Sequence, residues 1–211
     1  MDISEIVIPI LDGVLELMPD ERLPDPDRLS YYVLEKKRII YLDYDIGPGV
    51  MMIHRMIVRW NMEDLGKPVE ERVPIKLLIM STGGSLDYMW AMVDDILASK
   101  TPVYTYNLSD SHSAASIIFM AGQKRFMMPH ASIVVHQGSG SFAGDAGKIF
   151  DQTEAYREEL KRMRSFILER TDIPKATLTK HASNDWTLTA EECMKYNVCT
   201  DIIQSLEDVV Q

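Results

Sequence analysis

The segment IKLLIMSTGGSLDYMWAMVDDIL, residues 75–97, decides the fold class. Residues 75–80 form a largely apolar run typical of a buried strand, and residues 81–84 interrupt it with two consecutive glycines. Apolar side chains then recur at helical spacing from Leu86 to Leu97. A strand, a glycine turn and a helix in this order form a crossover unit, which predicts an α/β domain with a largely parallel sheet.

Segments of the same style lie on both sides of this unit, from Ser30 onward. Short apolar runs predict strands, and longer periodic runs predict helices. The predicted strands are residues 38–42, 103–107 and 132–137, and the predicted helices are residues 50–60 and 114–122. Residues 185–189 have the local pattern of a turn or cap before a helix at residues 190–196.

The N-terminal stretch has a different pattern. Apolar residues alternate over residues 7–17 on both sides of Asp12-Gly13, which predicts a β-hairpin, and Pro9 favours an edge strand. Residues 20–27 are rich in proline and charge and predict a linker. The hairpin is therefore interpreted as an appendage to the α/β domain.

The longest periodic segment is residues 145–170, where apolar residues recur at spacings of three and four. Acidic residues near its start and basic residues near its end suit the helix dipole. Such a helix is about 39 Å long, more than a domain of this size covers by itself. We therefore expect it to project and to pack against a neighbouring subunit, and a monodisperse monomer in solution would contradict this expectation.

Composition excludes several classes of protein. The 211 residues are 46% hydrophobic, and 22 basic against 32 acidic residues give a net charge of -10, which argues against a nucleic-acid-binding surface. Apolar runs fall short of the about 20 residues that a membrane span needs, and Asp2 and Glu5 do not suit a secretory signal. Cys193 and Cys199 are too few for a disulfide framework or a zinc site. We expect a cytoplasmic protein with no metal or cofactor and no membrane contact.

Three polar residues interrupt apolar patterns and are candidates for chemistry. Ser113 begins a predicted helix, where free N–H groups can hold an oxyanion, although a helix cap is the plainer interpretation. His136 ends a buried-strand pattern, at the sheet edge where α/β sites form, although such a histidine is more often structural. Asp185 has the local pattern of a turn or cap, which is the plainer interpretation. His112 is a rival base, but adjacent side chains diverge on a helix.

Four motifs in order resemble the ClpP family of serine peptidases, over residues 31–203. They are residues 81–85 (STGGS), 113–122 (SAASIIFMAG), 129–137 (PHASIVVHQ) and 185–192 (DWTLTAEE). The SAASII variant is closer to the ClpP-like proteases of phage heads than to the bacterial housekeeping enzyme. The resemblance implies stacked ββα units of the ClpP/crotonase type with a protruding handle helix. It divides the chain into an N-terminal hairpin or axial-loop segment with linker, residues 1–29, and a ClpP-like serine peptidase domain, residues 30–211.

The resemblance also implies a catalytic triad. Ser113 matches the nucleophile, His136 the general base and Asp185 the residue that orients the base. Ser116 also follows two alanines, but counting back without a gap from the Ala121-Gly122 pair selects Ser113. A serine, a histidine and an aspartate in these roles perform acyl transfer.

Other positions match the family's substrate contacts. Gly84 and Ala114 match the backbone donors of the oxyanion hole, and Ser85, Gly138 and Ser139 are the expected substrate-binding residues. Two departures from the family stand out in the sequence. Thr82 stands where the family has proline, and residues 138–141 (GSGS) replace a proline-containing segment that pairs with substrate as an added strand.

The assembly expected from the resemblance is a homo-oligomer, a double heptameric ring joined by the handle helices. Its substrate would be unfolded polypeptide delivered by an AAA+ unfoldase. Alternatives are a phage prohead protease for capsid maturation and a non-catalytic scaffold subunit of a mixed ring. Crotonase-type acyl-CoA chemistry usually needs acidic catalysts, and a Ser-Lys signal peptidase needs a membrane anchor. Both fit this sequence less well.

Overall fold

The computed structural model describes residues 26–136, 138–182 and 184–210. The chain divides into two compact units, Met1–Lys36 and Lys37–Gln211. In the first unit the described part is helix α2 (Pro26–Lys36), so the last residues of the predicted linker belong to a helix instead. The predicted hairpin, residues 7–17, lies outside the described residues, and the domain division at residue 29 stays a prediction.

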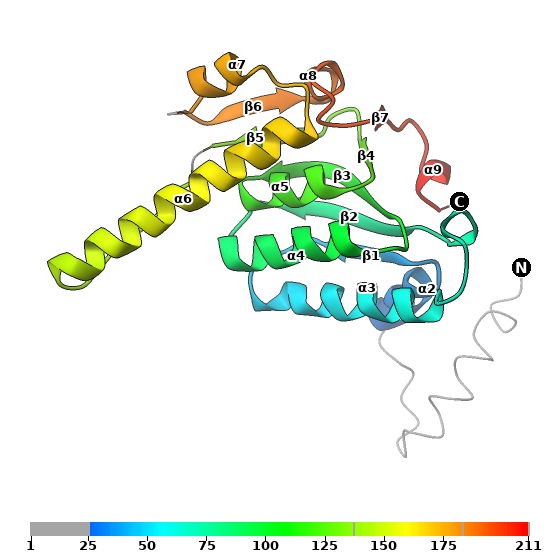
Figure 1. Cartoon of the computed structure of the whole chain (residues 1–211). Helices are drawn as coiled ribbons and strands as arrows, with labels where there is room; N and C mark the ends of the chain where they lie inside the picture. The colour runs from blue at the N-terminus through cyan, green and yellow to red at the C-terminus, as the bar shows by residue number, and fades with distance from the viewer. Residues whose placement is uncertain (1–25, 137, 183, 211) are drawn as a thin grey trace, which may run out of the picture. The chain divides into compact units, whose positions relative to one another are not determined.

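The second unit is built on a largely parallel sheet, as the sequence predicts (Figure 1). Five strands lie side by side with every neighbouring pair parallel: β1 (Ile39–Leu42), β2 (Ile75–Ser81), β3 (Val103–His112), β4 (Lys124–Met127) and β7 (Asp201–Ile202). The sheet divides along β3. The first half of β3 pairs with β4, and the last residues of β3 pair in parallel with β5 (Ser132–Val135). Strand β6 (Trp186–Thr189) pairs antiparallel with β5.

Three helices lie on one face of this sheet (Figure 1). They are α3 (Met51–Glu63), which follows the short turn η1 (Pro48–Val50), α4 (Leu86–Ala98) and α5 (Ala114–Ala121). All residues of α5 are buried, which explains the unbroken apolar run that predicted it. The remaining short elements are η2 (Val69–Glu71), α7 (Lys175–Lys180), α8 (Ala190–Lys195) and α9 (Glu207–Val210).

The crossover unit at residues 75–97 is confirmed as β2 and α4, but other predictions need correction. Strand β3 continues to His112 rather than ending at residue 107. Residues 186–189, predicted as a turn or cap, form strand β6 because β5 supplies the hydrogen-bonding partners, and only the cap is confirmed. Thr189 then caps α8 in a capping box with Glu192. The β5–β6 pairing joins segments more than fifty residues apart, and the end of β3 pairs with β5 across about 22 residues, so local pattern alone does not predict either.

The predicted handle is helix α6 (Ala146–Arg170), with Asp145 at its N-cap. Only its last third is buried, through Met163, Phe166 and Ile167, and the rest extends away from the sheet (Figure 1). Arg170 fixes the buried end, since its guanidinium donates to main-chain oxygens at the end of α5. No helix of the described residues has the length and apolar character to cross a bilayer.

Candidate active site

Ser113 lies at a sharp turn between the end of β3 and the start of α5. Its backbone has φ 54° and ψ -124°, a positive φ that is uncommon outside glycine. The turn is fixed by a hydrogen bond from the Ser113 N–H to the Val134 oxygen of β5, at 2.9 Å. Ser113 occupies the N-cap position of α5, as predicted, but within the described residues its side chain makes no capping hydrogen bond. Backbone strain of this kind clusters at functional sites.

Ser116, the rival serine, has a different place. It is buried, and its hydroxyl donates to the Ser113 main-chain oxygen at 2.6 Å. The Ser116 N–H donates to the same oxygen at 3.0 Å. Ser116 therefore supports the turn that carries Ser113, a role that the sequence alone did not suggest.

The antiparallel pairing of β5 and β6 brings His136 and Asp185 together. Val135 pairs with Trp186, and His136 and Asp185 are the next residues out on the two strands. His136 Nδ1 lies 3.6 Å from Asp185 Oδ1, just beyond hydrogen-bond distance. The Asp185 side chain is 77% exposed and that of His136 is 28% exposed, so both are open to solvent at the sheet edge.

The His136 ring has a different hydrogen-bond partner in this structure. The Gly138 N–H donates to His136 Nδ1 at 3.2 Å. Within the described residues, no hydrogen bond joins the Ser113 hydroxyl to His136. The structure thus brings His136 beside Asp185 but does not join the Ser113 hydroxyl to this pair among the described residues, and long or misaligned contacts are common in unliganded active sites.

His112, the rival base, lies on β3 and pairs with another carboxylate. His112 Nε2 is 3.4 Å from Asp110 Oδ1, and Asp110 also accepts a hydrogen bond from Ser132 at 2.8 Å. A metal site is not supported either, since the described residues contain no group of three histidine, cysteine or carboxylate ligands.

Two main-chain N–H groups near Ser113 are open. Within the part of the chain that the structure describes, the amides of Gly84 and Ala114 donate to no acceptor. Gly83 lies against the serine, because a Cβ at Gly83 would be 2.8 Å from Ser113 Cβ and 3.1 Å from the Ala114 nitrogen. Open amides beside a serine can hold a developing negative charge on oxygen.

Ile46 fixes the glycine turn, although no motif in the sequence marks this residue. Its N–H donates to the Gly83 oxygen at 2.7 Å, and its oxygen accepts from the Ser85 N–H at 2.8 Å. Gly84, at φ +146°, lies so close that an added Cβ would be 2.3 Å from the Ile46 oxygen. Glycine is therefore required at position 84 by the Ile46 backbone. Thr82, in place of the family's proline, is tied to Asp45 by a 2.9 Å hydrogen bond.

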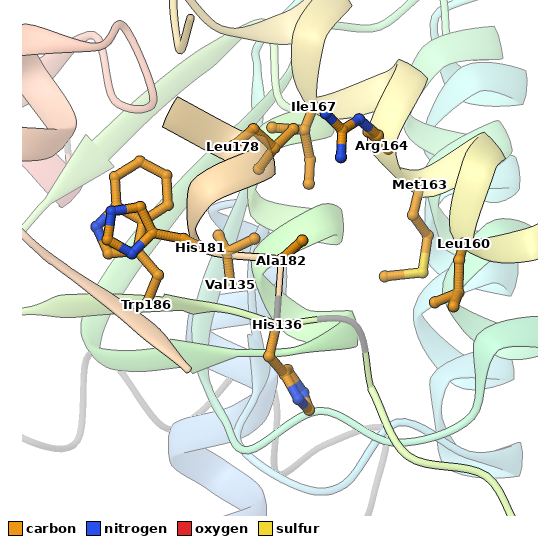
Figure 2. Close-up of a pocket in the computed structure, with 10 residues that line it drawn as sticks. All are labelled: Val135, His136, Leu160, Met163, Arg164, Ile167, Leu178, His181, Ala182 and Trp186. Atoms are coloured by element: carbon orange, nitrogen blue, oxygen red, sulfur yellow. The ribbon is translucent and has the colours of Figure 1, made fainter. Parts of the chain in front are cut away.

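A pocket opens beside His136 between the buried end of α6, helix α7 and strand β6 (Figure 2). Its walls are mostly apolar, with the two histidines and one arginine among them. In Figure 2 the α6 side chains line one side, and a stacked pair of rings, His181 and Trp186, 4.5 Å apart, lines the other. The lining residues are Val135, His136, Leu160, Met163, Arg164, Ile167, Leu178, His181, Ala182 and Trp186. Arg164 is held at the wall by hydrogen bonds to Thr179 Oγ1 and to the Lys175 oxygen.

Residues 138–141 lead from His136 toward α6. Gly138 has φ +78°, and an added Cβ would be 2.9 Å from the Tyr156 hydroxyl on α6. Farther along, the Phe142 ring packs edge-on against Tyr156 at 5.6 Å. Ser139 is exposed. Two of the three expected substrate-binding residues, Gly138 and Ser139, therefore lie on a segment next to His136, and Ser85 lies at the start of α4.

Comparison with known proteins gives consistent results. Residues 29–206 match the family described as Clp protease. An ATP-dependent Clp protease proteolytic subunit 2 of Corynebacterium diphtheriae is 28% identical over 84% of this chain and 87% of its own. The subunit 2 of Treponema denticola is 34% identical over 64% of this chain and 69% of its own. The proteolytic subunit of Deinococcus radiodurans is 26% identical over 84% of this chain and 86% of its own.

Proposed function

Since the chain belongs to the Clp protease family, it is a serine-type peptidase, and we propose that it hydrolyses peptide bonds of unfolded polypeptides through Ser113, His136 and Asp185. The observation that carries the proposal is the strained turn at Ser113, which holds this side chain at the start of α5 beside two open amides. Strand pairing that sets His136 next to Asp185 adds further support.

In the proposed reaction, Ser113 Oγ attacks the scissile carbonyl while His136 Nε2 accepts the hydroxyl proton. Asp185 holds the opposite ring nitrogen and stabilises the charged imidazole. The carbonyl oxygen becomes negative and accepts hydrogen bonds from the Gly84 and Ala114 amides. His136 then gives the proton to the leaving amine. Water attacks the acyl-enzyme with the same base, and Ser113 is restored.

Gly84→Ala tests the oxyanion hole. The new Cβ would be 2.3 Å from the Ile46 oxygen, so the turn must shift and carry the Gly84 N–H out of place. Loss of one such donor costs about 10²- to 10³-fold in kcat, which peptide hydrolysis measures. Gly66→Ala is the matched control, because Gly66 also has a positive φ, +83°, but has open space around its Cβ position. A Gly84→Ala enzyme as active as Gly66→Ala would exclude the Gly84 amide from the reaction.

The pocket beside His136 is proposed to receive the side chain that precedes the scissile bond. Its walls include Leu160, Met163, Ile167 and Leu178, which suit a medium-sized apolar side chain such as leucine or methionine. The pocket adjoins the base, so a residue bound there places its own carbonyl next to the catalytic groups.

Ala182→Phe is expected to fill this pocket and change specificity. We expect kcat/KM for peptides with leucine before the cleaved bond to fall about 10- to 100-fold relative to peptides with alanine there. Paired fluorogenic peptides measure this ratio. Labelling by a small fluorophosphonate, which does not need the pocket, is the control and stays unchanged. An unaltered leucine-to-alanine ratio would place the specificity pocket elsewhere.

The assembly proposed for this peptidase is a homo-oligomeric double heptameric ring in the cytoplasm. The exposed two-thirds of α6, including Phe150 at 74% exposure, provide a surface for packing between rings. The curated relatives are described as ATP-dependent, which supports an AAA+ unfoldase partner that feeds polypeptide into the chamber.

The proposed activity is tested on the isolated chain with fluorogenic peptides. Hydrolysis with apolar residues before the cleaved bond supports an active peptidase. An assembled ring that cleaves no peptide would instead indicate the scaffold subunit. Cleavage confined to capsid proteins would indicate the phage prohead protease.

A further inference from the structure

The hydrogen bond at His136 Nδ1 conflicts with the role proposed for that residue. In neutral imidazole one ring nitrogen carries the proton and the other accepts. The Gly138 N–H donates to Nδ1 at 3.2 Å, so Nδ1 is the acceptor and the ring proton is on Nε2. A protonated Nε2 cannot take the proton of Ser113.

Asp185 lies close enough to compete for the same nitrogen. Its Oδ1 is 3.6 Å from His136 Nδ1, and a carboxylate oxygen needs a proton on Nδ1 to form a hydrogen bond. The Gly138 amide and Asp185 therefore favour opposite tautomers of one ring. Only the tautomer that Asp185 favours leaves Nε2 free to act as the base.

From these contacts we propose that Gly138 is a positioning residue whose main-chain N–H holds His136 in a resting tautomer until substrate draws that N–H away. The inference rests on the proposed triad. An extended peptide paired along residues 138–141 offers carbonyl oxygens that compete for the Gly138 N–H. Once that N–H turns to the substrate, the ring proton moves through solvent from Nε2 to Nδ1, and Asp185 accepts from it.

The sequence explains why this chain has such a contact. Gly138 has a main-chain N–H, whereas a proline at this position would have none to donate. Its φ of +78° is one that proline cannot adopt, and the Tyr156 hydroxyl beside it leaves little room for a side chain. Glycine here permits the conformation that aims the amide at the ring.

Gly138→Pro removes the donor and is expected to shift the tautomer. Nitrogen NMR of ¹⁵N-histidine protein reports which ring nitrogen carries the proton, and a His136→Gln spectrum identifies the signal among the five histidines. We expect the proton on Nε2 in the unliganded wild type and on Nδ1 in Gly138→Pro. Gly138→Pro removes the hydrogen bond that holds the resting tautomer, so more molecules have Nε2 free to accept the Ser113 proton. For a hydrogen bond of ordinary strength, we expect the rate of fluorophosphonate labelling to rise about fivefold.

Gly144→Pro is the matched control, because Gly144 also has a positive φ, +144°, and lies farther along the same connection to α6. It is expected to leave both the tautomer and the labelling rate unchanged. A proton on Nδ1 of the unliganded wild type overturns the inference. This measurement uses the wild type alone, so it tests the inference even if Gly138→Pro does not fold. Equal labelling of folded Gly138→Pro and wild type overturns it as well. Wild type that is not labelled at all would overturn the proposed triad instead.

Discussion

Ser113→Ala is expected to reduce peptide hydrolysis about 10⁴- to 10⁶-fold, the range seen when a triad nucleophile is removed. The reason is that the remaining groups bind and polarise the carbonyl but supply no atom to attack it. Initial rates with a fluorogenic peptide measure the loss. Light scattering of the same sample tests assembly, which we expect to remain intact because the Ser113 side chain contributes no capping hydrogen bond.

Ser116→Ala distinguishes the structural role proposed for Ser116 from the nucleophilic role proposed for Ser113. Ser116 donates to the Ser113 main-chain oxygen, so its loss loosens the turn without removing the attacking atom. We expect a decrease in hydrolysis of less than about tenfold, which corresponds to one hydrogen bond. A larger loss for Ser116→Ala than for Ser113→Ala would reverse the two assignments.

Asp64→Ala is the second large effect and concerns stability. The Asp64 carboxylate is fully buried and accepts two hydrogen bonds from Arg38, at 2.5 and 3.0 Å, and further ones from Lys67 and Thr101. Removing the acid leaves the largely buried Arg38 guanidinium without its main partner. The free energy of unfolding is expected to fall by about 3–5 kcal/mol, measured by urea denaturation.

Glu63→Gln is the control for Asp64→Ala. Glu63 also pairs with Arg38, at 3.5 Å, but its side chain is half exposed. An exposed ion pair contributes about 1 kcal/mol or less, so this variant is expected to unfold almost like wild type. Equal destabilisation by the two substitutions would show that burial does not decide the strength of this network.

The same carboxylate predicts how stability depends on pH. Hydrogen bonds from Arg38, above all, hold the pKa of Asp64 well below its ordinary value, despite the opposing effect of burial. A lowered folded-state pKa means that the contribution is complete above the ordinary carboxyl pKa of about 3.9 and is lost as pH falls below it. Wild type is therefore expected to lose more stability than Asp64→Asn between neutral and acidic pH. Parallel pH curves would contradict this.

Patterns within one segment predicted the core of the fold. Residues 75–97 contain both periodicities and the glycine turn between them, so the strand and helix followed from local pattern. Residues 145–170 likewise predicted α6 to within one residue, because an acidic N-cap residue, Asp145, and the apolar spacing agree. Where propensity, capping and periodicity agree, sequence suffices.

Features that depend on distant partners were missed. Strand β6 is only four residues long and exists because β5 pairs with it. No glycine signals the positive φ of Ser113, because a tertiary hydrogen bond to Val134 and local ones from Ser116 hold this turn. Ile46 has no polar side chain, yet its backbone fixes the glycine turn. The His136 hydrogen bond to Gly138 is a main-chain contact that residue types do not reveal.

Mass spectrometry of the protein after reaction with a fluorophosphonate tests the central claim most directly. The account predicts one adduct per chain, on the peptide that carries Ser113, and none when His136 is replaced by alanine. An adduct on Ser116 or on another serine, or equal labelling of the His136→Ala variant, would contradict a Ser113 nucleophile activated by His136.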